Sequence, residues 1–243
     1  MGVENRNMHR EVQRPEAILF DLGSTLLCDS CSGPLNTRLR SLLEKETFAP
    51  FVEKELDLPT AIADAVEAVY RDGMEEFHVK KWLESSELLR GLNPSESPEA
   101  IERLIRSKVL SYSPPEDARR VLGEFIQLGI PMGVVSNSIF SSDLLRSDLA
   151  EHSILDAFRF VISSAEFGMR KPHSSIFEYA VEKLNVAAEA TWYVGDLWEN
   201  DVIGSHGAGL IPMWLNDSVS SSGVSVSHLR VRNWTELGEI LGV

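Results

Sequence analysis

Four short polar clusters contain the residue types that metal and phosphate chemistry requires. Each cluster follows an apolar run of the chain. In order they are Asp21–Thr25 (DLGST), Ser136–Ser138 (SNS), Arg170–Pro172 (RKP) and Gly195–Asp201 (GDLWEND). Taken singly, each cluster is also a common way to begin a turn or loop. Together they supply three carboxylates, one amine and a hydroxyl, which is a set that can do chemistry.

The carboxylates of Asp21, Asp196 and Asp201 would repel one another if they met in one cleft. Such a site normally holds a cation, and oxygen ligands with room for water and phosphate suit Mg²⁺. One Mg²⁺ and the Lys171 ammonium together balance the three negative charges. The sequence therefore predicts a magnesium site that can accept a phosphate group.

These clusters need a scaffold that brings them to one place. Five apolar runs bounded by turn residues are predicted as buried strands: Ala17–Phe20, Pro131–Val135, Phe158–Ile162, Thr191–Val194 and Leu210–Leu215. Helical patterns lie between the later runs, which predicts a doubly wound α/β fold with a parallel sheet covered on both faces. In such sheets ligands bind beyond the carboxyl ends of the strands, where the four clusters lie.

Two helices between these strands are well marked. For the first, Ser113 is the predicted N-cap, Pro114 the first helical residue and Gly129 the stop. The second is predicted over 174–184, with its apolar residues on one face.

Residues 34–110 contain no strand-like run. Leucines at helical spacing begin at Leu35, a second stripe runs from Ile62 to Tyr70, and Ser97–Pro98 opens a further helix. We therefore expect a catalytic α/β core formed by residues 15–30 and 111–243, and a helical cap domain over 31–110. Residues 1–14 have no apolar period and are expected to form a flexible tail.

Composition excludes several classes of partner. The 243 residues contain 23 Lys and Arg against 37 Asp and Glu, a net charge of −14, which repels nucleic acid and anionic membranes. No run reaches the roughly 20 apolar residues of a membrane span, and no signal-peptide pattern opens the chain, so a cytoplasmic protein is expected. A monomer and a homodimer both remain open. Cys28 and Cys31 are interpreted as structural or incidental thiols, since a lone CxxC lacks the rest of a zinc site.

The order DxxxT, Ser-Asn, Lys-Pro and GDxxxND, with a helical insert after the first motif, resembles the haloacid dehalogenase superfamily. The resemblance is to its phosphatase-like branch with an α-helical (C1-type) cap over a Rossmann-like core. It extends from Pro15 over nearly the whole chain and is most specific over Ser163–Gly209.

The resemblance implies phosphoryl-transfer chemistry. Asp21 would be the nucleophile that forms an aspartyl-phosphate, because covalent catalysis divides a difficult displacement into two steps. Ser136, with backbone N–H groups near Asn137, would hold phosphate oxygens, and Lys171 would offset charge on Asp21 and the transferring group. Thr25 would fix the loop.

The resemblance also implies how Mg²⁺ would be bound. Its ligands would be Asp21, the backbone carbonyl of Gly23, Asp196 and Asp201, the last directly or through water. The ion would screen the phosphate from the anionic nucleophile.

One position departs from the family pattern. Phosphatases of this family usually read DxDxT, and the second Asp protonates the leaving group, but here that position is Gly23. A positioned acid–base group is typically worth about 10²–10⁴ in rate. Substrates with good leaving groups would be affected least, and Asp29 or His78 is a candidate to replace the missing acid.

Three functions remain open on these residues. The favoured one is Mg²⁺-dependent hydrolysis of a small phosphomonoester, with a small phosphorylated metabolite as the partner molecule. The family's dehalogenases also lack the second Asp, but they have no use for the carboxylates of Asp196 and Asp201. The third possibility is a catalytically impaired relic that binds a ligand or protein. Trp192, Tyr193 and Trp214 are interpreted as core residues.

Overall fold

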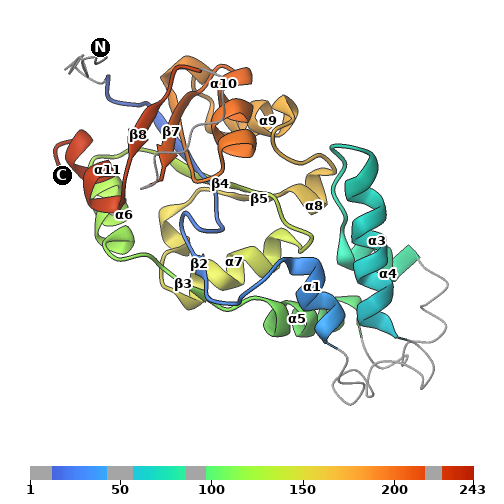
Figure 1. Ribbon diagram of the computed structural model, residues 1–243. Helices are drawn as coiled ribbons and strands as arrows, with labels where there is room; N and C mark the ends of the chain where they lie inside the picture. The colour runs from blue at the N-terminus through green and yellow to red at the C-terminus, as the bar shows by residue number, and fades with distance from the viewer. Residues whose placement is uncertain (1–12, 43–56, 86–96, 217–225) are drawn as a thin grey trace, which may run out of the picture.

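The computed structural model describes residues 13–42, 57–85, 97–216 and 226–243. A six-stranded sheet runs through its centre in the order β5-β4-β1-β6-β7-β8, and every neighbouring pair is parallel (Figure 1). Its strands are β1 (Ala17–Phe20), β4 (Met132–Ser136), β5 (Val161–Ser163), β6 (Thr191–Gly195), β7 (Ile211–Leu215) and β8 (Leu229–Val231). The predicted parallel sheet is confirmed, and the short strand β8 adds to it.

Helices cover both faces of this sheet. The helices outside the insert are α6 (Ala118–Gln127), α7 (Ser142–Glu151), α8 (Ser164–Phe167), α9 (Ser174–Leu184), α10 (Gly204–Gly207) and α11 (Trp234–Ile240). Short 3₁₀ turns lie at η2 (Leu155–Ala157) and η3 (Ala188–Ala190), and η4 (Trp198–Ile203) is a π-helical segment. Apolar residues of α6, α7 and α11 pack on one face and those of α9 on the other. The doubly wound α/β fold is therefore confirmed.

Alternating side chains of the central strands fill both layers. On one face the Phe20 ring stacks on Trp234 with centroids 5.6 Å apart and meets the edge of Phe158. On the other face Tyr193 packs edge-on against Phe177 of α9 at 4.9 Å. Because both faces of β1 and β6 are buried, their ends are held rigidly where the polar clusters begin.

The insert between β2 (Cys28–Asp29) and β3 (Tyr112–Ser113) is helical in its described parts. Its helices are α1 (Leu35–Ser41), α3 (Leu58–Asp72), α4 (Val79–Ser85) and α5 (Pro98–Val109), which lie to one side of the sheet in Figure 1. They surround an apolar cluster of their own. That cluster also includes Ile139, Phe140 and Leu144, so the insert packs directly on the residues that follow β4. The division of the chain into a core and a cap domain stays a prediction.

A two-stranded antiparallel ribbon joins the insert to the sheet domain. It pairs β2 (Cys28–Asp29) with β3 (Tyr112–Ser113). The helix predicted to begin at Ser113 is therefore wrong at its start: α6 begins at Ala118 after Asp117, whose φ is 65°. Pro114 and Pro115 explain the error, since a residue before proline is pushed into extended backbone, where Ser113 pairs with Cys28.

The other predicted boundaries agree more closely with the structure. Helix α9 spans the predicted residues, and Ser97 caps α5 by accepting the Ala100 N–H at 3.2 Å. Strand β5 starts three residues later than predicted because Phe158 still closes the η2 turn onto Leu155. Of the predicted tail, residues 1–12 lie outside the described residues. Among the described helices, none has the length and apolarity needed to cross a membrane.

Candidate active site

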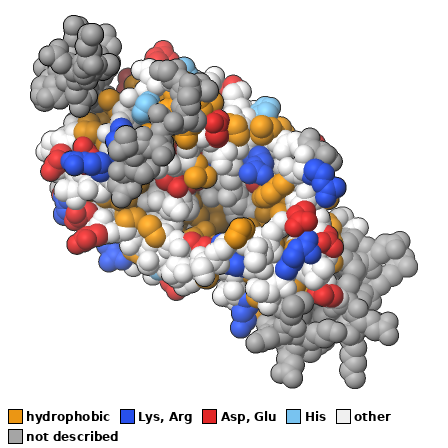
Figure 2. All heavy atoms as spheres, in the orientation of Figure 1, with side chains coloured by type: hydrophobic (Ala, Val, Ile, Leu, Met, Phe, Trp, Pro, Cys, Tyr) orange, Lys and Arg blue, Asp and Glu red, His pale blue; other side chains and the backbone are white. Residues whose placement is uncertain are grey.

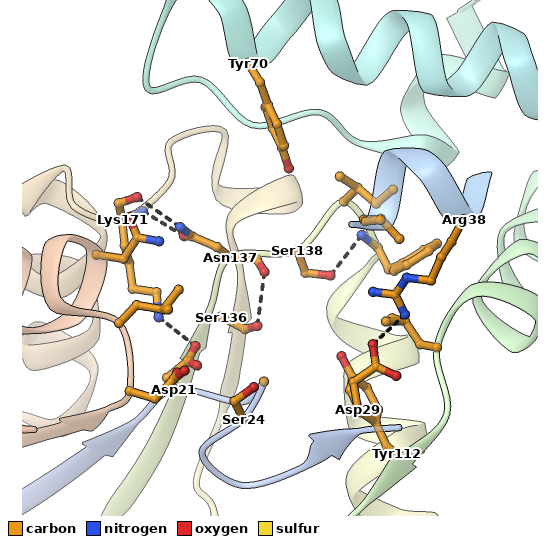
Figure 3. Close-up of a pocket in the computed structure, with 18 residues that line it drawn as sticks. Asp21, Ser24, Asp29, Arg38, Tyr70, Tyr112, Ser136, Asn137, Ser138 and Lys171 are labelled. Atoms are coloured by element: carbon orange, nitrogen blue, oxygen red, sulfur yellow. Dashed lines mark hydrogen bonds and ion pairs between the residues drawn. The ribbon is translucent and has the colours of Figure 1, made fainter. Parts of the chain in front are cut away.

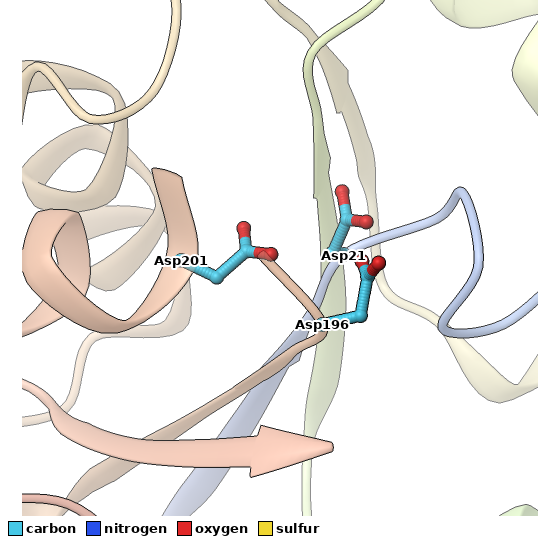
Figure 4. Close-up of side chains that lie close together, drawn as sticks. All are labelled: Asp21, Asp196 and Asp201. Carbon is cyan, nitrogen blue, oxygen red and sulfur yellow. The ribbon is translucent and has the colours of Figure 1, made fainter. Parts of the chain in front are cut away.

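Three carboxylates meet at the carboxyl edge of the sheet, as Figure 4 shows. Asp21 directly follows β1, Asp196 directly follows β6, and Asp201 lies on η4. Strands β1 and β6 are neighbours, with Phe20 opposite Val194, so their ends place the first two side chains together. One oxygen from each carboxylate lies within 4.8 Å of the others. The convergence expected from the sequence is present.

The Lys171 ammonium is bonded to two of these carboxylates. Nζ donates to Asp21 Oδ1 at 2.6 Å, to Asp201 Oδ1 at 2.7 Å and to the Tyr193 hydroxyl at 2.8 Å. The Tyr193 hydroxyl in turn donates to the Val135 carbonyl at 3.1 Å. An ammonium has three protons, so all of them are engaged in this arrangement.

Burial shifts the ionisation of the site. Removal from water raises the pKa of Asp21 to about 6, and the pKa of Asp196 to about 7. Burial alone would lower the pKa of Lys171, but the nearby carboxylates outweigh it and raise that pKa well above its ordinary value. The site therefore holds a fixed positive charge beside two carboxylates, Asp21 and Asp196, whose ionised forms a further cation would stabilise.

The donor set fits Mg²⁺. All three candidate side-chain ligands are carboxylates, and Oδ1 of Asp196 is buried with no hydrogen-bond partner in the part of the chain that the structure describes. An unpaired buried carboxylate oxygen is costly unless a cation satisfies it. The structure thus leaves an oxygen ligand available at the place where the sequence predicts the ion.

Gly195 makes room for the third carboxylate. A Cβ atom built at this position would overlap the Asp201 side chain. Asp201 is also held by the Leu197 N–H, which donates to Oδ2 at 2.9 Å. The glycine before Asp196 is therefore needed for space rather than for an unusual backbone conformation.

The predicted phosphate-binding residues lie beside Lys171. Ser136 ends β4 and faces the cavity, whereas the side chain of Asn137 is occupied elsewhere. Its Nδ2 donates to the Lys171 carbonyl at 2.9 Å, and its Oδ1 accepts the Lys171 N–H at 2.7 Å. The Asn137 amide consequently ties two loops together and positions the lysine.

A cavity of about 300 Å³ opens over these groups (Figure 3). Figure 2 shows the molecule as spheres in the orientation of Figure 1, with hydrophobic, acidic and basic side chains interspersed on this face. Its floor includes six of the residues singled out in the sequence: Asp21, Gly23, Ser136, Asn137, Lys171 and Asp196. Asp201 does not line the cavity; only 1% of its surface is exposed, and its Oδ1 accepts a hydrogen bond from the Lys171 ammonium. The outer wall comes from the insert and the ribbon, including Arg38, Tyr70 and Tyr112, and no motif in the sequence pointed to these residues.

The two candidate replacements for the missing acid lie in different places. Asp29 lines the cavity, but its carboxylate already accepts bonds from Arg38 and from two backbone N–H groups. His78 is buried and lines another cavity, together with Trp82; burial lowers its pKa. Neither is a free acid facing the nucleophile.

Tyr193 is the site residue that sequence reasoning missed. The sequence predicts only that Tyr193 packs in the core. Its ring does pack there, but its hydroxyl is also the third acceptor of the Lys171 ammonium. A tyrosine in a predicted buried strand indicates such a role, because a buried tyrosine hydroxyl needs a hydrogen-bond partner. Trp214 acts similarly, since its Nε1 donates to the Asp196 carbonyl at 2.9 Å.

Comparison with known proteins identifies the family of this chain. Residues 18–214 match the family model of the haloacid dehalogenase-like hydrolases. The chain belongs to this family. The hydrolase is 25% identical to glyceraldehyde 3-phosphate phosphatase of Pyrococcus abyssi, covering 82% of this chain and 80% of that one. It is 26% identical to phosphoserine phosphatase of Thermus thermophilus, covering 88% and 89%.

Solved structures share the fold of this hydrolase. One is 2-haloacid dehalogenase of Pseudomonas syringae, with a TM-score of 0.67 and 18% identity, covering 93% of this chain and 97% of that one. Likeness at this identity concerns the fold and does not choose between dehalogenase and phosphatase chemistry.

Proposed function

We propose that this hydrolase removes phosphate from a small phosphorylated metabolite in a Mg²⁺-dependent reaction through an aspartyl-phosphate. The observation that carries the proposal is the convergence of Asp21, Asp196 and Asp201 at one end of a cavity that the first two line, with Lys171 bonded to Asp21 and Asp201. The relatives named as phosphatases of glyceraldehyde 3-phosphate and phosphoserine support phosphomonoesters as the substrate class.

Asp21 is the nucleophile in the proposed reaction. Lys171 holds Oδ1 of Asp21, which orients the carboxylate toward the cavity. An oxygen of Asp21 bonds to phosphorus while the bond from phosphorus to the leaving oxygen breaks, and water then cleaves the aspartyl-phosphate to release phosphate and restore Asp21. Ser136 faces the same cavity and would donate its hydroxyl proton to a phosphate oxygen.

Asp21, Asp196, Asp201 and the Gly23 carbonyl would hold the magnesium ion. When bound, Mg²⁺ supplies positive charge that neutralises the phosphate oxygens as charge develops in the transition state. The helical insert, which forms the outer wall of the cavity, would act as the cap that excludes water and selects the substrate.

A direct test measures hydrolysis of p-nitrophenyl phosphate by the purified protein. This substrate has a good leaving group, so the missing acid at Gly23 limits it least. We expect Mg²⁺-dependent release of p-nitrophenol, loss of activity with EDTA, and a fall of at least about 10³-fold for Asp21→Asn, because an amide cannot serve as the nucleophile. An unchanged rate for Asp21→Asn would exclude the mechanism.

Assays on the same purified protein distinguish the phosphatase from a dehalogenase and from a protein that only binds ligand. The absence of a second carboxylate at Gly23 is the one feature that favours a dehalogenase, in which Asp21 would attack carbon. Halide release from a 2-haloacid in EDTA would establish that function instead. If neither assay detects activity and Mg²⁺ still raises the melting temperature, the protein binds its ligand without hydrolysing it.

A further inference from the structure

The cavity carries an ion pair at each of its two ends. At the inner end Lys171 pairs with Asp21, and at the outer end Arg38 of α1 pairs with Asp29 of β2 (Figure 3). Arg38 Nη1 lies 2.5 Å from Asp29 Oδ2, and each of the two side chains is 17% exposed. The outer cation is therefore neutralised by a partner of this chain before any ligand arrives.

Asp29 is held in place by more than the arginine. Its Oδ1 accepts the backbone N–H of Cys31 and that of Ser111, both at 3.1 Å. Burial acts to raise the pKa of Asp29, but these bonds and the one from Arg38 outweigh it and lower the pKa. The carboxylate thus stays ionised at neutral pH and keeps cancelling the guanidinium charge.

Counting charges around the cavity indicates what it accepts. The carboxylates of the two ion pairs, together with those of Asp196 and Asp201, exceed the two cations by two charges, which one Mg²⁺ would balance. The rest of the described outer wall is uncharged and includes Leu35, Tyr70 and Tyr112. Among the described residues that line the cavity, each Lys or Arg is already paired with a carboxylate. A second anionic group of the substrate would therefore find no free cation there.

We propose that the hydrolase selects phosphomonoesters whose leaving group is small and uncharged, and that Asp29 enforces this choice by neutralising Arg38. The volume of about 300 Å³, at the small end of the range for ligand sites, sets the size limit. A leaving group with a carboxylate would lose part of its hydration in this partly buried space without meeting an uncancelled cation, and an unpaired charge of this kind is a common source of specificity. This inference rests on the proposed function.

The first test compares two inhibitors of p-nitrophenyl phosphate hydrolysis with Mg²⁺ present. Glycerol 3-phosphate and 3-phosphoglycerate have the same three-carbon skeleton and differ in an alcohol against a carboxylate. We expect the inhibition constant of glycerol 3-phosphate to be at least about tenfold lower, which corresponds to about 1.4 kcal/mol. If glycerol 3-phosphate inhibits no better than 3-phosphoglycerate, or does not inhibit, the proposal is overturned.

Two variants then test the residues. Asp29→Asn leaves the Arg38 charge uncancelled, so the ratio of the two inhibition constants should move at least about tenfold toward 3-phosphoglycerate. Arg38→Met leaves the Asp29 charge uncancelled, so the ratio should move the opposite way. Tyr70→Phe, which changes no charge on the same wall, should leave the ratio unchanged. General damage to the fold would not produce opposite shifts, and shifts in one direction or none would contradict the role of the pair.

The outcome is separable from that of the proposed function. Absence of Mg²⁺-dependent p-nitrophenyl phosphate hydrolysis refutes phosphatase activity itself. Normal hydrolysis of that substrate combined with tighter binding of 3-phosphoglycerate refutes only the selection by charge.

Discussion

Gly23 lies two residues after Asp21, at the position where the sequence resemblance leads us to expect a second acid. No atom lies within 4 Å of a Cβ built there, and the backbone is outside the left-handed region, so a side chain fits without strain. The vacancy faces the same cavity as Asp21. The loop around Gly23 could therefore accommodate an acidic side chain without a change of backbone conformation.

Restoring a carboxyl at this position gives a residue-scale prediction. Gly23→Asp should raise turnover of alkyl phosphates by about 10²–10⁴, because a poor leaving group needs a proton, and should raise turnover of aryl phosphates much less. Measuring kcat/KM over a series of leaving groups checks it. The dependence on leaving-group acidity should flatten in the variant; an equal gain for all substrates would mean that another group already donates the proton.

At the scale of elements, the end of β6 and the adjacent η4 together position the carboxylates of Asp196 and Asp201. Gly195→Ala should push the Asp201 side chain aside and weaken Mg²⁺ binding by at least about tenfold, since a Cβ there overlaps the carboxylate. Calorimetric titration with Mg²⁺ measures the loss. Gly207→Ala in the nearby α10, where a Cβ meets no atom within 4 Å, is the matched control and should bind like the wild type.

How far the elements could be predicted depends on where their partners lie in the chain. Helix α9 and the ends of β1 and β6 can be predicted from local apolar patterns and from the polar residues that bound them. Asp21 and Asp196 directly follow β1 and β6, and Lys171 lies just before α9. The ribbon could not be predicted, because Cys28 pairs with Ser113 far along the chain while Ser113–Pro114 imitates a helix start. The Arg38–Asp29 ion pair could not be predicted for the same reason, because its two residues come together only when the ribbon and α1 pack against each other.

For the whole molecule, the raised pKa values couple stability to pH and to Mg²⁺. In the metal-free protein Asp21 and Asp196 ionise near pH 6 and 7, but in the unfolded chain near their ordinary value of 3.8. Between about pH 4 and 7 the folded state therefore binds more protons, and these two groups make folding less favourable as the pH rises. Mg²⁺ binds the ionised form and should reverse this loss.

Thermal melts with and without Mg²⁺ check the coupling. At a concentration near 100 times its dissociation constant the ion adds about 2.7 kcal/mol, which for a chain of this size corresponds to roughly 5–10 °C in Tm. The increment should be larger at pH 8 than at pH 5, where protons compete for the carboxylates. Asp196→Asn is the control and should lose most of the increment at both pH values, while an increment independent of pH would contradict the assignment.

The engagement of every proton on the Lys171 ammonium has a consequence for turnover. To bind a phosphate oxygen, the lysine must give up one of its three present acceptors, and Tyr193 is the one without charge. Binding at this point exchanges a bond to a neutral hydroxyl for a bond to a charged oxygen, so its net gain is smaller than for a lysine with a free proton. Free phosphate offers the same oxygen atoms as the substrate and so gains no more binding free energy from Lys171. This lysine therefore contributes little to retention of the product after hydrolysis.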